Sequence, residues 1–149
     1  MRKKMRCAIF TVVGMMLLSS GSVMAQSGFG LRAGVTAEPN QFHFGAHYIT
    51  GSLVKALTFR PNLEIGVGSD VTTFAFNFEF AYSIIRRSNY SAYVGLGPAL
   101  NIYDNGDTDT GGGLNVLLGV EHETGLFGEI KVGAFDSPDF KFTVGYTFK

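Results

Sequence analysis

The three histidines of the chain are the residues best suited to acid–base or nucleophilic chemistry. A serine-hydrolase arrangement on a strand needs a hydroxyl two residues from the histidine, so that the imidazole accepts its proton. His43 and His47 are followed two positions later by a glycine and an isoleucine, which supply no nucleophile. His122 has Thr124 at that spacing, but the pair falls in a predicted turn, where histidines are usually solvated. We therefore predict no catalytic residue.

The sequence also gives little support for thiol chemistry or metal binding. The only cysteine, Cys7, lies in the N-terminal leader, so the mature chain has neither a thiolate nucleophile nor a disulfide. Asp104, Asp107 and Asp109 precede three glycines and loosely resemble a calcium loop, but the distal glutamate of an EF-hand is missing. We predict no metal site and no cofactor site.

The first 25 residues read as a cleaved secretory signal peptide. Arg2, Lys3, Lys4 and Arg6 form a basic start, an apolar run of about a dozen residues follows, and Val-Met-Ala ends the leader at Ala25. That run is shorter than the ~20 residues that a membrane-spanning helix needs. Residues 26–149 then form one domain. Its 8 basic residues stand against 12 acidic ones, so a nucleic-acid partner is not expected.

Strict alternation of apolar and polar residues, the period of a strand with two different faces, recurs throughout residues 26–149. In the last run, Phe140, Phe142, Val144, Tyr146 and Phe148 alternate with polar or small residues. Eight such runs predict eight strands: 29–35, 42–48, 57–67, 74–82, 92–102, 114–121, 126–133 and 140–148. The connections between them, including 105–113, are rich in Asn, Asp, Gly, Ser and Pro. Eight is the smallest strand number of a membrane barrel.

The composition of the two faces predicts which one points inward. The polar face carries many glycines, which suit the narrow interior of an eight-stranded barrel. It also carries four basic and four acidic residues, and buried charges need partners. These are Arg32, Arg60, Lys131, Lys141, Glu64, Glu79, Glu121 and Glu129. The other face is rich in Phe, with Tyr near strand ends, as on a lipid-facing surface. A soluble lipocalin-like barrel, apolar side inward, is the alternative.

Several of these runs resemble the outer-membrane β-barrel domain family of porin-like and OmpX/OmpA-type proteins. The resemblance rests on 59–68, 92–98, 113–121 and the closing 142–148, and it extends over nearly all of the mature chain. It implies an eight-stranded antiparallel up-and-down transmembrane β-barrel in the bacterial outer membrane. It also implies recognition by the barrel-assembly machinery through a terminal aromatic residue. Here Lys149 follows Phe148, which departs from that pattern.

In such a barrel both termini lie in the periplasm, which places the acidic connections outside the cell. They contain Glu38, Asp70, Asp104, Asp107, Asp109, Asp136 and Asp139, without a Lys or Arg. One hypothesis is that these acids share divalent cations with lipopolysaccharide phosphates; solvated loops are the simpler interpretation.

We expect a monomeric, non-enzymatic outer-membrane barrel with an envelope-structural or surface-interaction role, surrounded by outer-membrane lipids and lipopolysaccharide. Three alternatives stay open. They are a lipid A-modifying enzyme, a very narrow channel and a soluble periplasmic lipid carrier.

Overall fold

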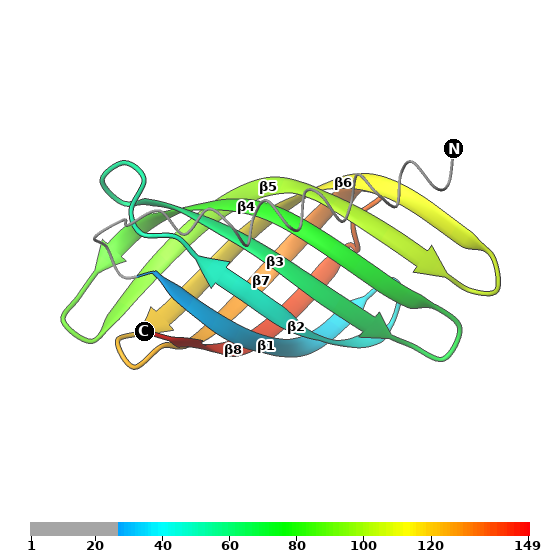
Figure 1. Cartoon of the computed structure of the whole chain (residues 1–149), viewed down its shortest axis with the longest axis horizontal. Helices are drawn as coiled ribbons and strands as arrows, with labels where there is room; N and C mark the ends of the chain where they lie inside the picture. Colours follow the sequence, from blue (N-terminus) through cyan, green and yellow to red (C-terminus); the bar gives the residue numbers. More distant parts are fainter. Residues whose placement is uncertain (1–26) are drawn as a thin grey trace.

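The structure, a computed structural model, describes residues 27–149, so the predicted signal peptide lies outside the described residues. This part of the chain forms a closed barrel of eight antiparallel strands, which confirms the predicted fold class (Figure 1). The strands are β1 (Gly28–Ala37), β2 (Gln41–Ile49), β3 (Leu57–Val67), β4 (Thr72–Arg86), β5 (Tyr90–Asp104), β6 (Thr108–His122), β7 (Leu126–Phe135) and β8 (Phe140–Phe148). Within residues 27–149, no helix is long and apolar enough to cross a membrane.

Each strand pairs with the next one along the chain, and β8 pairs with β1 to close the barrel. The closing register joins Phe29 to Phe148 and Ala37 to Phe140. Because every strand has a hydrogen-bonded neighbour on both sides, the barrel has no free sheet edge, as a membrane-spanning sheet requires. The strands run obliquely to the barrel axis (Figure 1).

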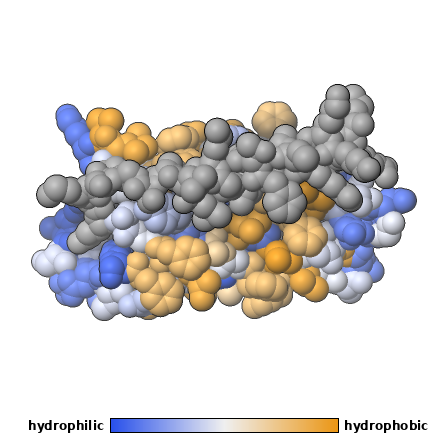
Figure 2. All heavy atoms as spheres, in the orientation of Figure 1, coloured by the Kyte–Doolittle hydropathy of each residue, from blue (hydrophilic) through white to orange (hydrophobic). Residues whose placement is uncertain are grey.

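Alternate residues of each strand face opposite sides of the wall, as predicted. In β8, Lys141 and Thr143 are buried inside the barrel, while Phe142 and Val144 lie exposed on its outer surface. The visible outer face has a hydrophobic middle and hydrophilic residues at both ends (Figure 2). The interior is therefore polar and the exterior apolar, the reverse of a soluble barrel.

The β5–β6 hairpin is longer than predicted. Residues 105–113 were expected to form a connection, but β5 extends to Asp104 and β6 begins at Thr108. Ile102 pairs with Thr110, and Asn101 with Gly111, in an unbroken register. A tight turn at Gly106, whose φ is 105°, lets the ladder continue through residues whose composition alone favours a loop.

β4 also continues beyond its predicted end, to Arg86. It does so through a bulge: Ser83 pairs with Tyr93 and Ile85 with Ala92, which leaves Ile84 as the extra residue. A bulge inserts one residue and reverses which side the following residues face.

Candidate functional site

The centre of the lumen holds a network of buried ions. Lys131 on β7 lies 2.8 Å from a carboxylate oxygen of Glu79, 3.5 Å from Glu64 and 3.6 Å from Glu129. Arg32 on β1 lies 2.9 Å from Glu129 and 3.4 Å from Glu64. All five side chains are at most 3% exposed. Two cations thus hold three carboxylates together across the barrel.

The remaining charges of the predicted set extend this network toward the two ends. Lys141 on β8 donates to Glu64 at 2.6 Å. Toward the chain termini, Glu121 lies 3.3 Å from Arg60 and 2.8 Å from Lys149. All eight predicted interior charges therefore make ion pairs, which confirms the predicted charge balance. Lys149, absent from that prediction, adds a cation at the rim.

Three asparagine amides and the Glu79 carboxylate form a closed hydrogen-bonded ring beside the ions, which was not predicted. Asn115 donates to Asn77 at 2.7 Å, Asn77 donates to Asn62 at 2.7 Å, and Asn62 donates to Glu79 at 2.8 Å. Asn115 also donates to the other oxygen of Glu79 at 3.0 Å. Both carboxylate oxygens of Glu79 therefore accept an amide hydrogen bond, in addition to its pair with Lys131. The alternation places all three asparagines on the inward face, which is the signal that could have found them.

Tyr93 is the largest fully buried side chain in the described residues, at 1% exposed. Its hydroxyl donates to Glu129 at 2.7 Å, and the Arg60 guanidinium lies over its ring at 4.0 Å. The ring passes over Gly119, where a Cβ would collide with it. The inward glycine is thus needed to make room for the tyrosine, as the predicted small interior face requires.

The two lumen histidines contact hydroxyls rather than joining the ion pairs. The ring nitrogens of His43 lie 2.8 Å from Thr36 Oγ1 and 3.0 Å from Thr143 Oγ1. His47 Nε2 lies 2.9 Å from Thr147 Oγ1. These threonines come from β1 and β8, so spacing along β2 could not reveal them.

Burial closes the two β8 threonines of these contacts to a substrate. Thr143 is fully buried and Thr147 is 1% exposed, so neither hydroxyl is accessible to a substrate. His47 Nδ1 has no hydrogen-bond partner, and thus lacks the orienting carboxylate of a triad. His122 hydrogen-bonds Thr124 at 3.0 Å in the exposed β6–β7 turn, where it was predicted.

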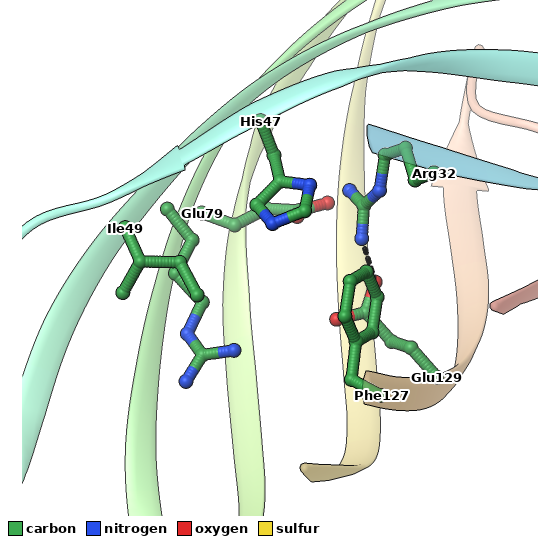
Figure 3. Close-up of a pocket in the computed structure, with 7 residues that line it drawn as sticks. Arg32, His47, Ile49, Glu79, Phe127 and Glu129 are labelled. Atoms are coloured by element: carbon green, nitrogen blue, oxygen red, sulfur yellow. Dashed lines mark hydrogen bonds and ion pairs between the residues drawn. The ribbon is translucent and has the colours of Figure 1, made fainter. Parts of the chain in front are cut away.

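A cavity of about 10 Å³ lies within the lumen, lined by seven residues (Figure 3). Arg32, His47 and Glu129 converge on it from three strands, and the Arg32–Glu129 pair forms one wall. Such a volume holds about one water molecule. It is far too small for a lipid chain or a sugar.

The charges at the two ends of the barrel are segregated, as the sequence predicted. The seven acids of the predicted outer connections lie at the end opposite the termini, in or next to the turns at 38–40, 68–71, 105–107 and 136–139. At this end Tyr103 donates to the Asp136 carbonyl and Asn101 donates to the same oxygen, so the β7–β8 turn is tied to β5. Within residues 27–149, no three His, Cys, Asp or Glu side chains are grouped to hold a metal ion.

Comparison with known proteins identifies no family for this chain. No family model matches the chain, and no curated protein matches it. Among solved structures, the outer membrane protein Ail of Yersinia pestis in a phospholipid bilayer nanodisc is 11% identical, with a TM-score of 0.48. The match covers 83% of this chain and 100% of that one. A major outer membrane protein from Thermus thermophilus is 9% identical, with a TM-score of 0.47, covering 82% and 99%.

Proposed function

We propose that this protein is an integral outer-membrane β-barrel with a structural or surface-interaction role and no enzymatic activity. The observation that carries the proposal is the reversed polarity of the barrel. Large apolar side chains such as Phe29, Phe42 and Leu96 are about half exposed on the outer wall, while charged residues fill the lumen. A soluble monomer rarely exposes so large an apolar surface, whereas a bilayer covers it.

The height of the wall supports the same assignment. The shortest strands, β2 and β8, have nine residues each. At ~3.3 Å per residue and a tilt of roughly 40°, nine residues rise about 23 Å. The apolar band of outer-membrane barrels is about 25 Å tall. Even the shortest strands therefore match a bilayer.

Aromatic residues mark the edge of this band at the terminal end. Tyr48, Tyr82, Tyr90 and Tyr146 are all exposed there, near the strand ends that lie with the chain termini. Tyrosine favours the membrane–water interface because its ring is apolar and its hydroxyl can stay hydrated.

The lumen argues against the alternative functions. A lipid carrier needs an apolar cavity, whereas this interior holds buried ion pairs and a cavity of about 10 Å³. A lipid A-modifying enzyme needs an accessible nucleophile or acid–base pair, whereas the lumen carboxylates of Glu64, Glu79 and Glu129 are all engaged by cations.

We further propose that the termini face the periplasm and that the protein acts as a monomer. The acidic turns would then face the lipopolysaccharide headgroups, and the barrel-assembly machinery would insert the chain. The segregation of acids at one end and Lys55, Arg86, Arg87 and Lys149 at the other supports this orientation.

Fractionation and gel migration test the proposal. The full chain, expressed in a Gram-negative host, should appear in the outer-membrane fraction. It should migrate faster on a gel when unheated than when boiled, because a closed barrel resists unfolding by detergent. A soluble periplasmic product would refute membrane residence. Lipid A of altered mass in the expressing cells would refute the non-enzymatic role.

A further inference from the structure

The terminal end of the barrel opens into a vestibule of about 600 Å³. This volume lies within the range of small-molecule sites, about 300–1,000 Å³. Its wall combines cations with hydroxyl and amide groups from the β2–β3 connection, β3, the β4–β5 hairpin and the C-terminal end of the chain. The polar lining includes Thr50, Ser52, Thr58, Ser83, Ser88, Asn89 and Ser91.

The bulge in β4 directs Arg86 into this vestibule. Continued alternation from Ser83, which faces inward opposite Tyr93, would place Arg86 on the outer side. With Ile84 as the extra residue, Arg86 pairs instead with the vestibule residue Ser91. Ile85 then faces outward, opposite Ala92. The bulge thus places Arg86 on the inner face, where continued alternation would have placed Ile85.

The charge of the vestibule is predominantly positive. Its lining side chains include Arg60, Arg86, Arg87 and Lys149, against two glutamates. Arg60 and Lys149 both pair with Glu121. Within residues 27–149, Arg86 and Arg87 have no carboxylate within 4.0 Å, so their guanidinium groups are available to an anion.

We propose that this vestibule is a binding site for a phosphate group, with Arg86 and Arg87 as its principal ligands. A guanidinium can donate two parallel hydrogen bonds to a phosphate, and a tetrahedral dianion accepts further bonds from other directions. Ser88, Asn89 and Ser91 lie in or beside the same hairpin turn and supply neutral donors. The inference goes beyond the proposed role, since it rests on the lining of the vestibule and not on the outer wall.

The phosphate could belong to a soluble molecule or to a phospholipid headgroup at the rim, and the experiment separates these sources. The mature protein has four arginines, Arg32, Arg60, Arg86 and Arg87, so selective ¹⁵N labelling gives four side-chain Nε signals. Inorganic pyrophosphate is titrated into the folded barrel in zwitterionic nanodiscs, and then in nanodiscs containing phosphatidylglycerol. Sodium chloride at matched ionic strength is the control.

Pyrophosphate should shift the Arg86 and Arg87 signals saturably and leave the lumen residue Arg32 unchanged. Arg86→Gln with Arg87→Gln should weaken binding, followed by calorimetry, at least about tenfold, since each charge-assisted hydrogen bond is strong. Lys55→Gln removes a charge at the same end but outside the vestibule lining, and binding should persist. Shifts already present with phosphatidylglycerol, and not displaced by pyrophosphate, identify the lipid headgroup as the source.

Three results would overturn the proposal. They are equal shifts with sodium chloride, succinate binding as tightly as pyrophosphate, or unchanged pyrophosphate affinity in the double variant. Heat-modifiable gel migration of every variant verifies that the barrel has folded, so a loss of binding reports on the site itself.

Discussion

Lys131 is the cation whose removal should destabilise the barrel most. It is 1% exposed and has three carboxylate neighbours, from Glu79, Glu64 and Glu129. Replacing it with methionine keeps the volume and the flexible stem but leaves three acids facing two remaining cations. We expect Lys131→Met to lower the free energy of unfolding substantially.

The magnitude follows from the distances. Coulomb's law with an effective dielectric constant of 20 gives roughly 6 kcal/mol for the 2.8 Å contact of Lys131 with Glu79. Burying the ammonium group also costs desolvation free energy. Because the methionine variant has no such cost, the net loss of stability is smaller than this Coulomb energy. Removing one partner of a buried ion pair lowers stability by about 3–5 kcal/mol. We expect the free energy of unfolding to fall by an amount in that range.

The assay is reversible urea unfolding in lipid vesicles, followed by far-ultraviolet circular dichroism because the chain has no tryptophan. Lys55→Met, at an exposed position, is the matched control and should change stability little. Adding Glu79→Gln to Lys131→Met should restore part of the loss. A loss below about 1 kcal/mol, the range of a solvated surface pair, would refute the conclusion that the lumen network is shielded from water.

Three further substitutions and one control test other parts of the structure by the same unfolding assay. Tyr93→Phe removes the hydroxyl that donates to Glu129 and should cost about 1.5–3 kcal/mol; no change would mean that the carboxylate does not need this donor. Gly119→Ala places a methyl against the Tyr93 ring and should cost about 1–3 kcal/mol, whereas Gly112→Ala meets no atom within 4 Å and should not destabilise by overpacking. Val144→Arg puts a charge on the outer face in the middle of β8 and should cost about 2–4 kcal/mol in a bilayer; equal stability would contradict lipid exposure there.

The sequence predicted the strands more accurately where both faces had distinct compositions. The 57–67 and 140–148 predictions match β3 and β8 residue for residue. Prediction failed in the β5–β6 hairpin, because a glycine-rich segment can still pair when its neighbouring strand fixes the register. It also missed the β4 bulge, because Ile84 and Ile85 do not themselves show which of them is the extra residue.

The candidate sites, like the strands, were only partly predictable from the sequence. The sequence identified the eight charges of the lumen but not their partners, since Arg32 and Glu129 are 97 residues apart. Only the structure shows that Arg86 and Arg87 line a vestibule.

Alone, the sequence determined the number of strands and the side of the wall to which most residues belong. Both follow from a two-residue period, a property of the extended backbone that each strand carries locally. Only the tertiary structure decided which carboxylate meets which cation, and that Arg86 faces inward. Those outcomes depend on the register at which eight strands close into a ring, and the closure brings together residues that no local spacing connects.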